Sequence, residues 1–262
     1  MNSVARIVAI TNQKGGVGKT TTGVNLAASL AAAHQRVLLV DVDPQGNATM
    51  GSGVEKGALT STVYQVLLGQ RSIPEVRVRS ENGEYDVVPA NRNLAGAEVE
   101  LVELERREAR LKEALASIEG DYDYILIDCP PALNLLTVNG LVAAHAVMIP
   151  MQCEYYALEG LSDLVATIRR VRLHLNPALE IEGLLRTMYD PRNTLAQQVS
   201  AQLLEHFGEK VYRTVIPRNI RLAEAPSHGL PALKFDRSSK GAQAYVALAG
   251  EMLNRNPPNG RP

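Results

Sequence analysis

The chain is poor in the residues that stabilise small secreted domains and membrane spans. Its 262 residues include two cysteines, no tryptophan and two phenylalanines. Two cysteines cannot form a disulfide framework, and neither stands with histidine at the spacing of a zinc site. No apolar run approaches the roughly 20 residues of a membrane-spanning helix, and the first ten residues do not resemble a signal peptide. We therefore expect a soluble globular protein in a reducing, cytoplasmic compartment.

The chain also has little net charge. The formal value is −1, which taken alone disfavours nucleic acid as a partner. This average hides an uneven distribution, because residues 1–185 carry 16 basic and 22 acidic side chains whereas residues 186–262 carry 11 basic and 6 acidic ones. A basic final third favours an anionic partner, although ordinary fluctuation also produces differences of this size.

Short runs rich in Val, Ile and Leu alternate with helical patterns along the chain, and such runs are typical of strands buried on both faces. We predict strands at Arg6–Thr11, Arg36–Asp41, Tyr85–Pro89, Tyr124–Asp128, Ala146–Pro150, Ile181–Met188 and Val211–Ile216. We predict helices at Lys19–Ala33, Leu94–Ile118, Gly160–Leu175, Thr194–Phe207 and Ser239–Leu253. The alternation predicts an α/β fold, a doubly wound and mostly parallel sheet flanked by helices, in one domain over residues 1–253. We expect the polar residues 254–262 to form a disordered tail.

A glycine-rich loop, KGGVGKTT, separates the first predicted strand from the first predicted helix. This order of strand, loop and helix is the context that a phosphate-binding loop requires. Glycines let backbone N–H groups close around phosphate oxygens, and the helix N-terminus adds a favourable dipole. We expect Lys19 to reach the β- and γ-phosphates and Thr20 to join the Mg²⁺ shell. The residues predicted to bind the nucleotide here are Lys14, Gly15, Gly16, Val17, Gly18, Lys19, Thr20 and Thr21.

The loop departs from the ordinary phosphate-loop pattern, with Gln13 where a glycine is expected and with an additional lysine, Lys14. In this it resembles the deviant Walker A ATPases, which include ParA/Soj, MinD and nitrogenase iron protein. The resemblance implies that Lys14 crosses a dimer interface to the partner's nucleotide, so that ATP holds two subunits together. Cys129 and Cys153 do not match the cluster-binding cysteines of nitrogenase iron protein, which sets that member aside.

Three aspartates lie at or just after the ends of predicted strands. Alternation places Asp41 and Asp43 on the same side of the chain, at the sheet edge that carries the phosphate loop. A carboxylate there can orient water and contact the Mg²⁺ shell, or it can simply cap the following loop. The strand that ends at Asp128 has the form of a Walker B element, so we expect Asp128 near Mg²⁺. The resemblance links hydrolysis to Asp43. The predicted catalytic residues are Lys14, Lys19 and Asp43, and the predicted metal-site residues are Thr20, Asp43 and Asp128.

Four longer segments narrow the resemblance to the chromosomal ParA (Soj) proteins, over nearly the whole chain. They are residues 12–22, 40–49, 152–161 and 215–227. The resemblance implies a homodimer that forms with ATP and Mg²⁺, binds DNA non-specifically, associates with the nucleoid and partitions chromosome origins. It also implies a ParB/Spo0J-type partner that stimulates a slow intrinsic ATP hydrolysis.

The resemblance also assigns individual residues. It places Glu154 at the interface near the nucleotide, where the alternative is a plain helix entry. It places Pro217, Arg218 and Asn219 at the adenine, where the alternative is a proline turn. The DNA-binding positions of the family match Arg192 and Arg221, both in the basic final third. Contacts of this kind reach phosphates, so DNA affinity should fall steeply with salt.

Two other functions stay open. A MinD-like, membrane-associated positioning ATPase needs a C-terminal amphipathic anchor, but Ser239–Leu253 is Ala-rich and weakly basic, so we expect no membrane partner. A regulatory protein that holds ATP without turnover is the other alternative, and Asp43 argues against it. Because few residues precede the first predicted strand, we do not expect an N-terminal helix-turn-helix.

Overall fold

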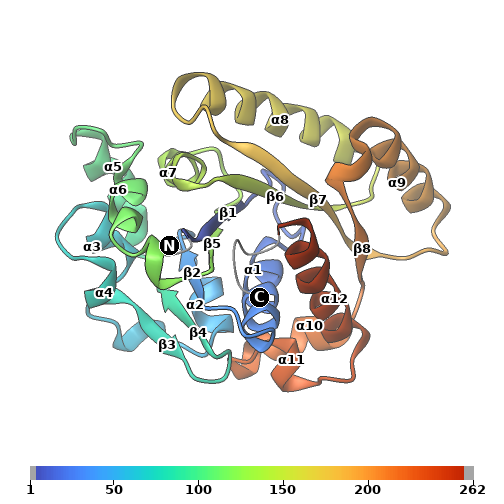
Figure 1. Cartoon of the computed structure of the whole chain (residues 1–262), viewed down its shortest axis with the longest axis horizontal. Helices are drawn as coiled ribbons and strands as arrows, with labels where there is room; N and C mark the ends of the chain where they lie inside the picture. Colours follow the sequence, from blue (N-terminus) through green and yellow to red (C-terminus); the bar gives the residue numbers. More distant parts are fainter. Residues whose placement is uncertain (1–3, 257–262) are drawn as a thin grey trace.

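One eight-stranded sheet organises the chain in the computed structural model, which describes residues 4–256 (Figure 1). The strand order is β3-β4-β2-β5-β1-β6-β7-β8, and all neighbours are parallel except β3 and β4. The strands are β1 (Arg6–Ile10), β2 (Val37–Asp41), β3 (Val78–Ser80), β4 (Tyr85–Val88), β5 (Tyr124–Asp128), β6 (Ala146–Gln152), β7 (Glu180–Tyr189) and β8 (Val211–Pro217). The predicted fold class is confirmed.

All seven predicted strands are present, and β3 is the one that the pattern did not indicate. It contains three residues, and Arg79 at its centre is exposed and pairs with Asp86 of β4 at 3.1 Å. A short polar edge strand of this kind carries no apolar run for a sequence pattern to detect.

Helices cover both faces of the sheet. They are α1 (Lys19–Ala32), α2 (Asn47–Gly51), α3 (Val63–Leu67), α4 (Ile73–Val76), α5 (Leu94–Val102), α6 (Arg110–Ala116), α7 (Leu135–Ala143), α8 (Ala157–His174), α9 (Thr194–Phe207), α10 (Ile220–Glu224), α11 (Ala232–Phe235) and α12 (Lys240–Arg255). Helices α1 and α12 pack on one face, whereas α7, α8 and α9 pack on the other (Figure 1). Alternation along β1 divides its side chains between these layers, with Ile7 in one hydrophobic cluster and Val8 in the other.

The single helix predicted at Leu94–Ile118 is wrong, because the structure has two helices there, α5 and α6. Between them Arg106 has a φ of +53°. The buried side chain of Asn139 holds the break, donating to the carbonyl of Arg107 at 2.8 Å and accepting from the amide of Leu111 at 3.1 Å. This hydrogen bonding comes from α7, a distant segment, so the local helical pattern could not show it.

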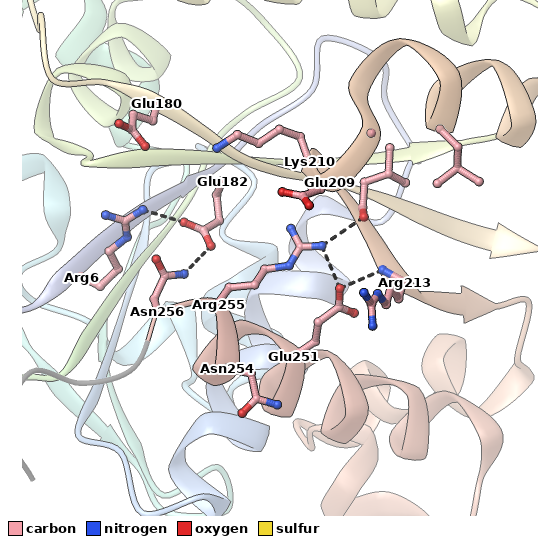
Figure 2. A pocket seen from close by; sticks show the side chains of 13 residues that line it. Arg6, Glu180, Glu182, Glu209, Lys210, Arg213, Glu251, Asn254, Arg255 and Asn256 are labelled. Carbon is pink, nitrogen blue, oxygen red and sulfur yellow. Dashed lines mark hydrogen bonds and ion pairs between the residues drawn. The ribbon is translucent and has the colours of Figure 1, made fainter.

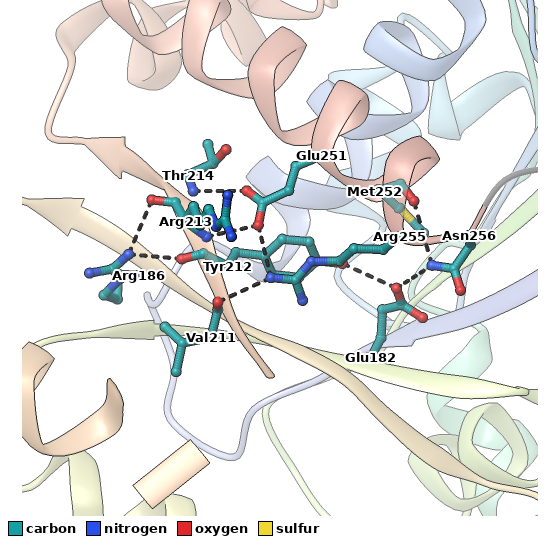
Figure 3. A network of polar contacts seen from close by, with 10 residues as sticks. All are labelled: Glu182, Arg186, Val211, Tyr212, Arg213, Thr214, Glu251, Met252, Arg255 and Asn256. Atoms are coloured by element: carbon teal, nitrogen blue, oxygen red, sulfur yellow. Dashed lines mark hydrogen bonds and ion pairs between the residues drawn. The ribbon is translucent and has the colours of Figure 1, made fainter. Parts of the chain in front are cut away.

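The C-terminal helix α12 extends to Arg255, two residues beyond its predicted end (Figure 3). The Arg255 guanidinium lies 4.1 Å from the centroid of the Tyr212 ring and donates to the carbonyl of Val211 and to Glu251. Asn256 donates to Glu182 at 2.6 Å. Of the predicted tail, Asn254 thus lies within α12, Arg255 and Asn256 are anchored, and the remainder lies outside the described residues.

A polar cavity of about 700 Å³ adjoins this network at the amino edge of the sheet (Figure 2). Arg6 of β1 and Glu182 of β7, which both line it, form an ion pair at 2.8 Å. The network therefore ties the first strand, the last strands and the last helix together.

Part of the positive charge of the final third is structural. Arg186 is buried and donates to the hydroxyl of Ser200 and to the carbonyl of Tyr212, each at 2.8 Å. Because Arg186 and Arg255 serve the fold, the positive charge available to a partner is smaller than the sequence count indicates.

The packing around β7 gives a prediction about stability. A methyl group on Gly183 would lie 2.6 Å from the Tyr212 ring and 2.9 Å from the carbonyl oxygen of Lys210. We expect Gly183→Ala to lower the free energy of unfolding by about 1–3 kcal/mol, measured by urea denaturation. The matched control is Gly160→Ala in α8, where a methyl group meets nothing within 4 Å; we expect it to raise the free energy of unfolding by about 0.5–1 kcal/mol. Equal midpoints for the two variants would contradict this account of the packing.

Candidate functional site

Three neighbouring strands place the phosphate loop and the three aspartates at one edge of the sheet. β1 lies between β5 and β6, and β5 in turn pairs with β2, all in parallel. The carboxyl ends of parallel strands meet at the same edge. The phosphate loop follows β1, Asp128 ends β5, Asp41 ends β2 and Asp43 lies two residues beyond it.

The phosphate loop has the backbone that its glycines allow. Gly16 and Gly18 have φ values of +74° and +87°, in the region that disfavours any residue with a Cβ. Lys19 opens α1 and is buried, and its Nζ donates to the carbonyl of Lys14 at 3.0 Å. Burial lowers the pKa of Lys19, and the negative charges of Asp128 and Asp43 oppose this effect. A buried ammonium group thus lies within reach of two carboxylates, in a loop shaped for anions.

The Thr20 hydroxyl donates to Oδ2 of Asp128 at 2.7 Å, which joins α1 to the end of β5. Asp128 is fully buried, and its Oδ1 has no hydrogen-bond partner among residues 4–256. Burial, and secondly the charge of Asp41, raise the pKa of Asp128 well above its usual range. A hydrated cation would satisfy the unpaired oxygen, so these residues fit Mg²⁺. The described part of the chain has no cluster of three His, Cys, Asp or Glu side chains arranged for a metal, so phosphates and water must complete the shell.

Asp41 and Asp43 have different surroundings. Asp41 is fully buried and accepts hydrogen bonds from the backbone and hydroxyl of Thr49 and from the backbone of Asp43. Burial raises its pKa to about 6. Asp41 therefore caps the loop that follows β2, which is one of the two roles that the sequence left open for it. Asp43 caps too, through Oδ1 and the amide of Gln45 at 2.9 Å. Its Oδ2 has no hydrogen bond within the described residues, so that oxygen can orient water.

Lys14 does not point into its own phosphate loop. Its Nζ lies 2.5 Å from Oε2 of Glu154, and both side chains are about half exposed. Glu154 follows β6, and the two exposed aromatic residues Tyr155 and Tyr156 come next, in an edge-to-face contact with ring centroids 5.0 Å apart. The structure thus joins two predicted nucleotide-binding residues, Lys14 and Glu154, at the protein surface.

A cavity of about 180 Å³ adjoins the end of the phosphate loop. It brings Gly18 and Thr21 together with Pro217, Arg218 and Asn219, which the sequence placed at the adenine. The side-chain carbonyl of Asn219 accepts from the Arg221 amide at 3.0 Å, so its NH₂ group is the part that a base edge could meet. Glu154 does not line this cavity.

Thr187, Met188 and Tyr245 also line the cavity, and sequence reasoning did not assign them a role. The Tyr245 hydroxyl lies 3.1 Å from the Thr22 hydroxyl, which fixes α12 behind the phosphate loop. No motif marks these residues, because they reach the loop from β7 and from the C-terminal helix.

The two arginines predicted to bind DNA lie after neighbouring strands. Arg192 follows β7, its side chain is 88% exposed, and it pairs with Asp190 at 2.8 Å. Arg221 is in α10, after β8, and pairs with Glu224 at 2.8 Å and Asp236 at 3.3 Å. Because β7 and β8 are parallel, both arginines lie at the edge of the sheet that carries the phosphate loop.

Comparison with known proteins gives consistent relationships over nearly the whole chain. Residues 5–181 match the family model described as an AAA domain. The sporulation initiation inhibitor protein Soj of Bacillus subtilis is 55% identical, covering 95% of this chain and 98% of that protein. The chromosome partitioning protein ParA of Caulobacter vibrioides is 52% identical, covering 95% and 94% respectively.

A solved structure agrees with these relatives in fold. The cobyrinic acid a,c-diamide synthase of Mycobacterium smegmatis, with a bound ATP analogue and magnesium, superposes with a TM-score of 0.84. It is 40% identical and covers 96% of each chain. The deviant phosphate loop, its carboxylates and relatives of this similarity together show that the chain belongs to the ParA/Soj family of P-loop ATPases.

Proposed function

We propose that this ATPase is a switch that dimerises with ATP and Mg²⁺, binds DNA non-specifically and partitions chromosomes. A ParB/Spo0J-type partner stimulates its hydrolysis and so releases it from DNA, and the protein works on the nucleoid. The observation that carries the proposal is the position of Lys14. A phosphate-loop lysine held at the surface, away from its own loop, is available to the nucleotide of a second copy.

The surface around Lys14 supports self-association. Tyr155 and Tyr156 are 74% and 71% exposed and adjoin Glu154. Exposed tyrosines are enriched at protein interfaces because they bury a large apolar area and retain a polar group. Dimerisation across this face would cover the aromatic pair and bring each Lys14 towards the other subunit's phosphates.

The hydrolysis site supports a slow switch. Lys19 supplies positive charge, Thr20 and Asp128 fit the Mg²⁺ shell, and Asp43 can orient water. None of these four side chains is a histidine. Stimulation by a partner is consistent with a site that positions water without a strong base.

DNA is favoured over a membrane as the second partner. Arg192 and Arg221 lie at one edge of the sheet, and their carboxylate partners, Asp190, Glu224 and Asp236, are all partly exposed. Such surface ion pairs contribute little to stability, so DNA phosphates can replace them. In contrast, the apolar side of α12 is buried against the sheet, with Tyr245, Leu248 and Met252 in the core. Among the described residues, no helix is long and apolar enough to cross a bilayer.

Replacing the phosphate-loop lysine tests the nucleotide site. Lys19→Ala removes the buried ammonium group. We expect ATP affinity to fall about tenfold to a hundredfold and dimerisation to be lost. Fluorescent-nucleotide titration and sedimentation measure the two effects. Lys234→Ala, which removes an exposed lysine paired with Glu84, is the control and should bind ATP as the parent does. Parent-like affinity in Lys19→Ala would refute the site.

The role of Asp43 is tested by removing only its charge. Asp43→Asn keeps an oxygen that can accept from the Gln45 amide, and Asp43→Ala does not. We expect both variants to bind ATP and to hydrolyse it at least about a hundredfold more slowly, measured as phosphate release. If Asp43→Asn hydrolyses ATP as the parent does and Asp43→Ala does not, Asp43 only caps the loop and does not orient water.

The DNA surface is tested by replacing its arginines singly. We expect Arg192→Ala and Arg221→Ala each to weaken DNA binding. Each should also reduce the slope of log affinity against log salt concentration by about 1 for each phosphate contact that is lost. Fluorescence anisotropy in the presence of ATP measures both effects. The control is Arg71→Ala, which removes an exposed arginine with a similar ion pair, to Glu75. Loss of ATP-dependent dimerisation in the Arg192 or Arg221 variant would assign that arginine to the fold instead.

A further inference from the structure

The carboxyl end of β7 departs from regular strand geometry. Met188, next to the last residue of the strand, has a φ of +47°, in the left-handed region. The pairing of β7 with β8 shifts register between Arg186 and Tyr189. A residue other than glycine persists in this conformation only where its surroundings hold it, and such residues cluster at ligand sites.

At this irregularity two successive residues line one cavity. In a regular strand Thr187 and Met188 would point to opposite faces of the sheet. Here both line the cavity of about 180 Å³ that also contains Gly18 and Pro217. Strand irregularities beside active sites commonly re-aim side chains in this way.

Thr187 contacts the phosphate loop from the side. It is buried, and its hydroxyl donates to the carbonyl of Val17 at 2.8 Å. Its methyl group would lie 3.7 Å from a Cβ placed on Gly18, so the two residues are close neighbours. Thr187 therefore holds the loop at the point where α1 begins.

Met188 is held from the neighbouring strand. The side-chain amide of Gln152, the last residue of β6, donates to the Met188 sulfur. Gln152 pairs with Thr187 in the β6–β7 register, one position from Met188. Methionine is unbranched and polarisable, and its sulfur packs favourably against aromatic rings. Pro217 and Leu222 line the same cavity, so its apolar lining suits a flat aromatic base.

We propose that Met188 is a specificity-determining residue that forms one wall of the base pocket. Gln152 is a positioning residue for the Met188 sulfur, and Thr187 is a positioning residue for the phosphate loop. This inference rests on the proposed placement of the base beside Pro217, Arg218 and Asn219. Two successive residues of β7 then serve the two ends of the nucleotide, Met188 the base and Thr187 the phosphates.

The test compares a ligand with a base and a ligand without one. Each variant is titrated with Mg²⁺-ADP and with Mg²⁺-tripolyphosphate, the latter by competition against a fluorescent ADP, and folding is followed by thermal denaturation. We expect Met188→Ala to weaken ADP binding about tenfold and to leave tripolyphosphate binding unchanged, because only the wall facing the base is removed. Met188→Leu, which keeps an apolar wall, should recover most of the ADP affinity. Gln152→Leu should weaken ADP binding in the same selective way.

Thr187 is expected to behave differently. Thr187→Val removes the hydrogen bond to Val17 and should weaken both ligands, whereas Thr187→Ser keeps the hydroxyl and should restore both. Parent-like ADP binding in Met188→Ala, or an equal loss of both ligands in that variant, would overturn the role of Met188. Failure of the parent protein itself to bind Mg²⁺-ADP would instead overturn the proposed function, so the two failures are distinguishable.

Discussion

The hydrogen bond from the Thr20 hydroxyl to the buried carboxylate of Asp128 fixes the start of α1 against the end of β5. The phosphate loop runs from the end of β1, which pairs with β5, to the start of α1, so this contact helps to fix the position of its glycines. Asp128 retains one unpaired buried oxygen within the described residues, and a neighbouring loop supplies Asp43. Negative charge gathered in a buried place is unfavourable without cations, and Lys19 together with Mg²⁺ supplies them. The loop is thus built around charges that a bound metal–nucleotide complex completes.

The distribution of charge has a more specific meaning than a basic final third. Arg186 and Arg255 stabilise the fold, because they donate hydrogen bonds to backbone carbonyls, to Ser200 and to Glu251. Arg192 and Arg221 instead lie at the edge of the sheet that carries the phosphate loop, on the segments that follow β7 and β8. ATP binding and DNA binding would therefore share one edge. Nucleotide-driven dimerisation could then present two such edges to a single duplex, which would make weak phosphate contacts additive.

The sequence alone predicted the parallel sheet, because continuous Val, Ile and Leu runs survive wherever strands are buried on both faces. It also predicted that the glycine-rich loop, Asp43 and Asp128 lie at one edge of the sheet, since glycines and carboxylates at strand ends leave a local pattern. It did not predict the break between α5 and α6, which depends on Asn139 of a distant helix. Nor did it predict Thr187 and Met188, which reach the cavity through a backbone irregularity that no residue type announces. A local sequence pattern does not show long-range hydrogen bonds or non-glycine residues with positive φ, and these two features determine the parts that were missed.

The central claim is that ATP controls binding to DNA, and it is tested most directly with the unmodified protein. The measurement is DNA binding with ATP, with ADP and without nucleotide, across a series of salt concentrations and two unrelated DNA sequences, with anionic liposomes as a parallel ligand. The account predicts binding only with ATP, a steep fall in affinity as salt rises and little difference between the sequences. Binding that is indifferent to nucleotide, or ATP-dependent binding to liposomes in place of DNA, would contradict it.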